Sequence, residues 1–440
     1  MVTGMEDVAV VGGGIAGLSA ARTLSRAGLS VTVLDAGGWI GGRLRTLHID
    51  GVAVDVGGSF FQDFYPHTLK LVSDMRLDDT MVNFPLKAGV MRSGRVRPAW
   101  PATSLVTGGL LPIASLARLA IGMAYSLIPA WRELDPDNLL AAIKYDDQTV
   151  EAWSTRVLGK EATDFFIAPL LRGVVHWDAE TTSRAVAYTI LKASLEHRAA
   201  YHLADGMSSL CDRIATGIKV QTGTRVVSIR RKNAHWEVEF ESDGAIRILK
   251  AHQAVCAVPA DQVCGLIPEL NASERTFFEN ISYSSTAVAV VQTASDERCD
   301  RPSVFFNDRE EPVIEGVTPS YSVGDPSGSR FVRISISTPA FRANQRLSDA
   351  ELGDFIVSAA CRVPYLNSWF KGARIVGLAR WPQALPIFDV GYLKRILRWQ
   401  EQPRQFASLA FAGDYLSGPY IEGAVRSGLS GASYLLDGTG

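Results

Sequence analysis

The sequence predicts an α/β protein in which segments from both ends of the chain share one parallel sheet and a mixed α+β domain fills the interval. Three observations predict this arrangement. A strand–turn–helix–strand unit opens the chain, short alternating strands follow, and an apolar strand with a small-residue helix start closes it, at residues 7–35, 225–258 and 411–428. At 440 residues the chain exceeds the size at which one hydrophobic core stops growing, so two domains are expected.

The opening unit has the pattern of a Rossmann-type dinucleotide-binding turn. It consists of a buried strand at residues 7–11, a glycine-rich turn at 12–17 that leads into a helix running to about residue 26, and a second strand at 30–34. Gly12 permits the tight turn, Gly14 lets the backbone approach a pyrophosphate, and Gly17 lets the helix pack closely on the strand. The N–H groups of Ile15 and Ala16, at the helix start, attract the phosphate charge.

Two features after this turn narrow the choice of ligand. Asp35, followed by Ala36, ends the second strand, where a carboxylate can accept from a ribose 2′-hydroxyl and repels a 2′-phosphate. Gly41, Gly42 and Arg43 then expose backbone beside a cation. This second glycine pair indicates a longer, bulkier ligand with a phosphate or a carbonyl group within reach of the arginine.

The C-terminal region offers a second place where a helix start can meet a ligand. An apolar strand ends in Gly413 and Asp414, and a helix rich in small residues begins near Glu422-Gly423, with Ile421 just before it and Ala424 just after. The positive end of a helix dipole attracts negative charge. Both ends of the chain are therefore expected to serve one ligand site.

These motifs, with a further Gly57-Gly58-Ser59 cluster, resemble the flavin-containing amine oxidase superfamily, which also holds protoporphyrinogen oxidases and carotenoid desaturases. The resemblance runs through most of the chain and implies FAD as the cofactor. It implies that Asp414 accepts hydrogen bonds from the ribityl hydroxyls and that Arg43 lies beside the phosphates or the flavin ring. The other positions that it assigns to the cofactor are Gly57, Gly58 and Ser59 along the returning backbone, Val226 beside the adenine, and Trp381.

The resemblance also implies that the helix near Glu422 points its positive end at the flavin N1 and C2 carbonyl. There it stabilises the anionic reduced ring. Structural roles are the alternatives at these positions. Asp414 could cap the next helix, Arg43 could be a surface cation, and the glycine pairs could form ordinary turns.

The expected architecture is a Rossmann-type FAD-binding domain built from discontinuous segments plus a mixed α+β substrate domain. The FAD-binding segments are residues 1–84, 204–280 and 373–440. The substrate segments are residues 85–203, expected to be helical, and 281–372. Within the middle FAD-binding segment, two alternating runs flank a Ser242-Asp243-Gly244 turn and predict a β-hairpin.

The resemblance to the amine oxidases leads to the first prediction of the reaction. Those enzymes place an aromatic pair against the flavin, and Tyr420 matches one member, with Phe388 or Tyr392 as its partner. The prediction is removal of hydride from a C–N bond of a small, fairly apolar amine onto flavin N5, with the flavin reoxidised by oxygen. Many amine oxidases carry a lysine on the strand that enters from the substrate domain. Ala289 takes that position here, which weakens both the amine and the oxygen prediction.

Two other functions stay open. The run 384–392 and the ending GPYIEGAVRSG resemble the porphyrinogen oxidase and desaturase branches equally well. Those enzymes take hydride from carbon in large hydrophobic molecules. The other alternative is a flavoprotein without net turnover, either an isomerase or a binding protein. No cysteine precedes Phe388 or Tyr392, so the flavin is expected to be noncovalently bound in every case.

Four polar residues are further candidates for substrate contact: His176, Tyr188, Arg333 and Gln62. His176 falls where the substrate domain of relatives often faces the cavity, and histidine titrates near neutral pH, so it is suited to orient or deprotonate a substrate. Tyr188 and Arg333 are polar groups in otherwise apolar segments. Packing, capping or surface roles are the alternatives for all four.

Composition excludes other classes of function. A net charge of −2 without a polybasic run argues against nucleic acid as a partner. Five scattered cysteines without CxxC spacing predict no metal site and, with no secretory signal, a cytoplasmic enzyme. Residues 105–131 are nearly all apolar but broken by Pro112 and Arg118, so a core or channel-lining helix is favoured over membrane-surface contact or a membrane span. The sequence makes no prediction of the oligomeric state.

Overall fold

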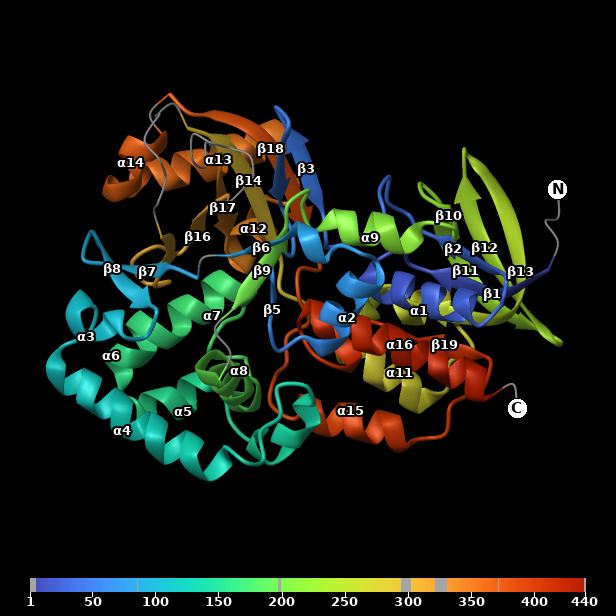
Figure 1. Cartoon of the computed structure of the whole chain (residues 1–440), viewed down its shortest axis with the longest axis horizontal. Helices are drawn as coiled ribbons and strands as arrows, with labels where there is room; N and C mark the ends of the chain where they lie inside the picture. The colour runs from blue at the N-terminus through green and yellow to red at the C-terminus, as the bar shows by residue number, and fades with distance from the viewer. Residues whose placement is uncertain are drawn as a thin grey trace.

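The computed structural model describes residues 5–84, 86–196, 199–293, 302–320, 331–370 and 372–438. Two seven-stranded sheets dominate these residues, and helices pack on their faces (Figure 1). The predicted α/β class with a second, mixed domain is confirmed.

The first sheet joins both ends of the chain. Its order is β10-β2-β1-β13-β12-β11, and β19 pairs with β13. The strands are β1 (Glu6–Val11), β2 (Val31–Leu34), β10 (Lys219–Gln221), β11 (Arg225–Lys232), β12 (His235–Ser242), β13 (Ala245–Cys256) and β19 (Leu409–Phe411). The pairs β1–β2, β1–β13, β2–β10 and β13–β19 are parallel. The predicted hairpin is the antiparallel pair β12–β13, which closes at Ser242 and Ala245.

The first and last long helices lie side by side on this sheet (Figure 1). They are α1 (Ile15–Arg26) and α16 (Ile421–Asp437). Their approach is close, because a Cβ added at Gly428 would collide with the backbone oxygen of Ala16. The two ends of the chain are therefore packed into one domain, and the starts of both helices lie near one another.

The second sheet has the order β18-β14-β17-β16-β15-β7-β8. The strands are β7 (Ala88–Arg92), β8 (Arg95–Trp100), β14 (Thr286–Gln292), β15 (Ser303–Phe306), β16 (Ile314–Pro319), β17 (Phe331–Ile336) and β18 (Arg374–Trp381). Helices α12 (Thr338–Asn344), α13 (Asp349–Arg362) and α14 (Pro364–Phe370) accompany it. Ala287 and Ala289 of β14 share a buried cluster with Leu352 of α13. Since strand side chains alternate, Thr286 and Val288 face the other way, toward the cavity described below.

Strand pairing departs from the expected domain division at two places, although residues 104–196 are mainly helical as expected. The sequence assigns residues 373–440 to the FAD-binding domain, but β18 pairs with β14 in the second sheet. Residues 85–203 are expected to be helical, yet β7 and β8 form a hairpin there that belongs to the same sheet. In both cases pairing with strands far away in the sequence decides the assignment, and a local pattern does not report such pairing.

The remaining elements complete the two domains. In the substrate domain these are α3 (Ser104–Gly108), α4 (Ile113–Ala130), η2 (Leu139–Tyr145), α5 (Val150–Val157), α6 (Lys160–Ala162), η3 (Thr163–Ile167), α7 (Ala168–Val175) and α8 (Arg184–Glu196). The others are β3 (Thr46–Ile49), β4 (Val52–Asp55), β5 (Phe61–Gln62), α2 (Pro66–Asp74), η1 (Asp78–Thr80), β6 (Met81–Asn83), β9 (Ala200–Leu203), α9 (Ser208–Ala215), α10 (Ala260–Leu266), α11 (Ala272–Glu279), α15 (Tyr392–Glu401) and η4 (Asp414–Leu416).

Helix α4 contradicts the expectation of a core or channel-lining helix. It lies at the outer edge of the molecule (Figure 1), and no residue of 105–131 lines the main cavity. Ile121 and Tyr125 are 71% and 76% exposed, and Ile113 and Ile128 flank them on the same apolar face. By length and composition α4 is the one helix among the described residues that passes as a membrane span, with 28% of it buried in the fold.

Contact of this face with a membrane surface, the alternative that the sequence left open, stays a prediction. We expect the protein to sediment with phosphatidylcholine vesicles, because exposed apolar side chains transfer favourably into the interfacial region of a bilayer. A double substitution, Ile121→Asp with Tyr125→Asp, should abolish sedimentation. Equal sedimentation of both proteins would contradict the prediction.

Candidate active site

One cavity of about 1300 Å³ is lined by residues from both sheets and from the helices between them. Its lining falls into two groups. We call the cradle the lining residues from the strand ends and loops of the first sheet together with the start of α16. We call the chamber the lining residues from η3, α7, α8 and the second sheet.

The glycine turn after β1 forms one side of the cradle. Gly12 has φ +108°, and an added Cβ would lie 2.6 Å from the backbone oxygen of Ala257, which follows β13. Only glycine therefore fits at this position. Gly14, by contrast, has no atom within 4 Å of an added Cβ, and it lies on the lining with Ile15 and Ala16. No side chain caps the start of α1. Open backbone beside uncapped helix N–H groups is suited to bind a pyrophosphate.

Asp35 and Ala36 lie on the lining at the end of β2. The Asp35 carboxylate accepts from the N–H of Gly13 at 2.6 Å and from the N–H of Gly37 at 2.7 Å. It therefore fixes the loops on both sides of it, a role that the sequence did not predict. Each carboxylate oxygen has further acceptor capacity, so the predicted bond from a ribose hydroxyl stays compatible with this geometry.

An ion pair joins the two ends of the chain across the cradle. Nη1 and Nη2 of Arg43 donate to the two carboxylate oxygens of Asp414 at 2.8 and 2.9 Å. Nη1 also donates to the backbone oxygen of Ala384 at 2.9 Å. The Asp414 side chain is 4% exposed and that of Arg43 is 33% exposed. Arg43 is therefore a fixed, paired cation on the lining, and the alternative of a free surface cation is wrong.

Most other predicted cofactor positions lie on the same lining. These are Gly41, Gly42, Gly57, Gly58, Ser59, Val226, Trp381, Gly413, Ile421 and Ala424. The Trp381 indole N–H donates to the backbone oxygen of Val56 at 2.8 Å, which fixes the ring beside the returning backbone. Gly17 lies behind the lining, where its missing side chain lets α1 pack against the backbone of Gly12, as the sequence predicts.

The Glu422 side chain turns away from the cavity, so it offers no side-chain contact there, and the role of the helix start beside it stays a prediction. The Glu422 carboxylate accepts from the backbone N–H of His67 at 3.0 Å, and from the N–H and hydroxyl of Thr68 at 2.8 and 2.7 Å. Both residues lie in the first turn of α2, which has no capping side chain of its own. Glu422 therefore stabilises the positive end of α2. Tyr420 and Ile421 stay on the lining because neighbouring helical residues point in different directions.

Only one member of the predicted aromatic pair reaches the cavity. Tyr420 lies on the lining, but Phe388 and Tyr392 do not. Both are buried, with ring centroids 4.4 Å apart, and the Tyr392 hydroxyl donates to the backbone oxygen of Tyr415 at 3.1 Å. Core packing therefore holds the two side chains behind the lining. The ring beside Tyr420 is instead Tyr65, stacked at 5.8 Å and also on the lining.

Tyr188 is likewise misassigned as a substrate contact. It is 2% exposed, its ring packs on Trp153 at 5.0 Å, and Arg184 donates to its hydroxyl at 3.1 Å. The side of α8 that lines the chamber carries Ala187, Ile190, Leu191 and Ser194. The apolar periodicity of this helix does not distinguish its two buried faces, and the sequence therefore selected the wrong one.

The walls of the chamber are mainly apolar, and the elements that form them pack closely on one another. Phe166, Ile167, Leu170, Leu171 and Val174 line it from η3 and α7, and Thr286, Val288, Phe305, Thr318 and Ser335 line it from the second sheet. Helix α7 lies tightly on the sheet, because a Cβ at Gly173 would overlap the Phe305 ring.

Three predicted polar residues lie on the lining: Gln62, His176 and Arg333. Nη1 of Arg333 donates to the backbone oxygen of Asp55 at 2.9 Å. The sequence analysis missed Tyr65 and Lys87, which also line the cavity. Lys87 lies far in sequence from every motif, whereas Tyr65 lies three residues after Gln62, a closeness that could have indicated it.

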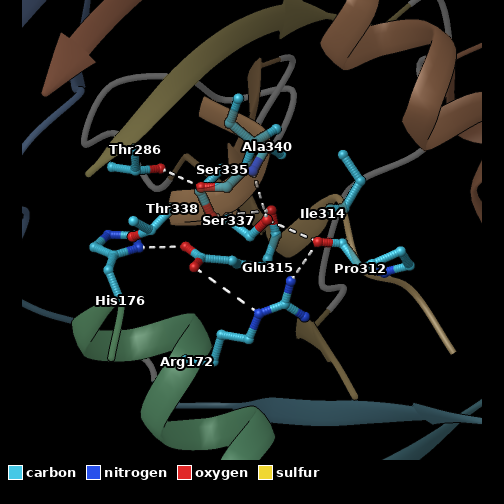
Figure 2. A network of polar contacts seen from close by, with 12 residues as sticks. Arg172, His176, Thr286, Pro312, Ile314, Glu315, Ser335, Ser337, Thr338 and Ala340 are labelled. Carbon is cyan, nitrogen blue, oxygen red and sulfur yellow. Dashed lines mark hydrogen bonds and ion pairs between the residues drawn. The ribbon is translucent and has the colours of Figure 1, made fainter. Parts of the chain in front are cut away.

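His176 has a partner that no pattern in the sequence indicates. Its Nδ1 lies 2.6 Å from Oε2 of Glu315, a side chain that is 2% exposed (Figure 2). Burial raises the pKa of the Glu315 carboxyl, and His176 and Arg172 oppose that rise. A strand glutamate looks the same in the sequence whether it faces solvent or a histidine on a cavity wall.

Taken with the fold, this site combines an anion-binding cradle for an elongated ligand with an apolar chamber, and comparisons with known proteins agree. A family model described as flavin containing amine oxidoreductase matches residues 15–436. Coproporphyrinogen III oxidase of Bacillus subtilis is 21% identical over 96% of this chain and 95% of its own, and that of Mycobacterium bovis is 24% identical over 97% of each. The solved cyclohexylamine oxidase of Brevibacterium oxydans shares the fold, with a TM-score of 0.76 at 18% identity over 99% of both chains.

The match extends over nearly the whole sequence and includes cradle residues from both ends of the chain, from Ile15 to Ala424. A member of this family takes a small-molecule substrate and passes its electrons to an acceptor through a flavin. The chain therefore belongs to the flavin-containing amine oxidoreductase family and is a flavin-dependent oxidoreductase.

Proposed function

We propose that the cradle binds FAD noncovalently. The glycine turn and uncapped α1 suit the pyrophosphate, Asp35 suits the ribose, and the Arg43–Asp414 pair lies where a charged and hydroxylated ligand segment would pass. No cysteine lies on the described lining, where a thioether link would need one. Cys299 lies outside the described residues. When bound, the flavin supplies a hydride acceptor.

We infer that the substrate is a large, mainly apolar molecule bearing carboxylates, oxidised at carbon, as a porphyrinogen is. The chamber is the observation that carries this inference, because its walls are mainly apolar while Arg333 and Arg380 of the second sheet, and Lys87 next to β7, place cations on the lining. Similarity to coproporphyrinogen III oxidases over the full chain supports the same class. Neither Phe388 nor Tyr392, the two alternative partners predicted for Tyr420, lies on the lining, which weakens the amine prediction.

An amine substrate stays the second candidate because of Tyr65 and Tyr420. These stacked rings form an aromatic wall on the lining that would accept a neutral amine or a flat ring. Burial raises the pKa of both phenols above the usual value, so both stay neutral across the physiological range. In either reaction the two rings would shape the cavity and orient the substrate, without transferring a proton.

Anaerobic bleaching of the flavin absorbance distinguishes the two substrates. We expect coproporphyrinogen III to bleach the bound flavin, and cyclohexylamine and putrescine to leave it oxidised. Bleaching by the amines alone would contradict the porphyrinogen proposal. We propose oxygen as the electron acceptor, so admission of air should regenerate the oxidised spectrum with one hydrogen peroxide per flavin reoxidised. Turnover without peroxide, or an isomerised product, would contradict that part.

Lys87 offers a test of the carboxylate inference. It is exposed at the edge of the chamber, so a neutral replacement should not disturb the core. We expect Lys87→Gln to raise KM for coproporphyrinogen III about tenfold, the loss of one charge-assisted contact of about 1.4 kcal/mol, with kcat unchanged. The methyl ester of the substrate is the control and should show the same KM with both proteins. Unchanged KM for the free acid would contradict the assignment.

A further inference from the structure

A histidine and a buried carboxylate meet on the chamber wall through two local irregularities of the backbone. His176 follows α7 with φ +55°, a left-handed conformation that few side chains adopt without strain. Glu315 lies at a β-bulge, where the pairing of β16 with β17 shifts between Ile314 and Gly316. Bulges re-aim a side chain relative to a regular strand. Both departures from regular structure serve one contact, the 2.6 Å pair of His176 Nδ1 and Glu315 Oε2.

Arg172 fixes the carboxylate from its other side. Figure 2 shows Glu315 between His176 and Arg172, both of which extend from α7. Nε of Arg172 lies 3.9 Å from Oε1 of Glu315, and its two terminal nitrogens donate to the backbone oxygens of Glu311 and Pro312 at 3.0 and 2.8 Å. The guanidinium is thus anchored to the segment that leads into β16. Glu315 is held between a fixed cation and the imidazole.

This pairing determines which nitrogen of His176 is available to a ligand. A carboxylate accepts hydrogen bonds, so it holds the imidazole proton on Nδ1 and leaves Nε2 without one. The His176 side chain is 21% exposed and lies on the cavity lining. An unprotonated Nε2 on a chamber wall is a proton acceptor, and the carboxylate behind it stabilises the imidazolium that forms.

We propose that His176 accepts the proton released when the substrate is dehydrogenated, and that Glu315 and Arg172 are the positioning residues for it. This rests on the proposed function. A two-electron dehydrogenation removes one hydride and one proton. The hydride carries the electron pair of a C–H bond to the flavin. An N–H or second C–H bond then breaks, its electron pair stays on the substrate as the new double bond, and the proton passes to Nε2 of His176.

The backbone at His176 permits an unusually clean test. Glycine adopts φ +55° without strain, so His176→Gly removes the imidazole without disturbing the end of α7. We expect kcat to fall roughly 10²- to 10⁴-fold, the usual size of a general-base contribution, with flavin content and KM unchanged. Imidazole added to the medium should restore part of kcat in proportion to its concentration. A kcat within twofold of the unaltered enzyme, or no rescue by imidazole, would overturn the proposal.

The role of Glu315 is tested against a matched buried carboxylate. Glu274 is 4% exposed and lies in the capping box of α11, off the cavity lining. Glu315→Gln should lower kcat tenfold or more, roughly, because the imidazolium loses its counter-charge, whereas Glu274→Gln should leave kcat unchanged. Equal effects of the two substitutions would overturn the positioning role.

A readout independent of turnover is the ¹⁵N NMR spectrum of histidine-labelled protein. We expect His176, identified by the signal that His176→Gly removes, to carry its proton on Nδ1, and Glu315→Gln to weaken that preference. A proton on Nε2 in the unaltered protein would overturn the proposal even if the enzyme is active. Failure of every substrate to bleach the flavin would contradict the proposed function instead, and the tautomer would still decide the state of His176.

Discussion

Replacing Gly14 by valine is expected to give a folded protein that no longer retains flavin. Gly14 has an ordinary extended backbone, φ −68° and ψ 171°, and no atom lies within 4 Å of an added Cβ. The open space around this Cβ leaves room for the valine side chain, which would occupy the space where a pyrophosphate must approach the backbone. We expect flavin content to fall more than tenfold, a loss above about 1.4 kcal/mol, measured by absorbance of the purified protein, with an unchanged circular dichroism spectrum.

Gly38 supplies the matched control for this substitution. It also has open space around an added Cβ and is exposed, but it does not line the cavity. Gly38→Val should keep a full complement of flavin. If Gly14→Val retained flavin equally well, the ligand would not approach this turn, and the cradle would be misidentified.

Removal of the charge on Asp414 is expected to weaken both the fold and the hold on the flavin. Asn at this position keeps the shape but leaves Arg43 without its bidentate partner, while the site itself is only 4% exposed. We expect Asp414→Asn to lower the free energy of unfolding by about 3 kcal/mol, as for other partly buried pairs that lose one partner. Urea unfolding, with and without added FAD, measures the change.

The exposed pair of Arg26 and Asp74 is the control for Asp414. Its side chains are 50% and 30% exposed, so solvent screens the attraction. Asp74→Asn should cost less than about 1 kcal/mol. Similar losses for the two substitutions would mean that the Arg43–Asp414 pair does not join the ends of the chain in any energetically special way.

The sequence predicted best what depends on local backbone requirements. Gly12 must adopt a positive φ and Gly17 must admit the neighbouring backbone, and these demands leave a readable spacing. The same holds for Asp414, whose place at the end of a short apolar strand indicated a ligand edge. Such features require particular residues at particular offsets, and few other structures produce the same pattern.

The sequence predicted poorly the features that depend on packing between segments far apart along the chain. Phe388 and Tyr392 have the right residue types for an aromatic wall, but their rings pack into the core between α15 and the neighbouring elements. Glu422 has the right place in the helix, yet its direction is set by α2, far away in the sequence. Glu315 was missed because its value comes from a β-bulge and from the histidine that it meets. None of these relations exists before the chain folds.

The central claim is that both ends of this chain fold around one flavin. The most direct measurement is the absorbance spectrum of the purified protein, followed by identification of the chromophore released on denaturation. We expect a yellow protein with flavin bands, and one FAD per chain that separates from the polypeptide on heating. A colourless protein that takes up no flavin when FAD is supplied would contradict it.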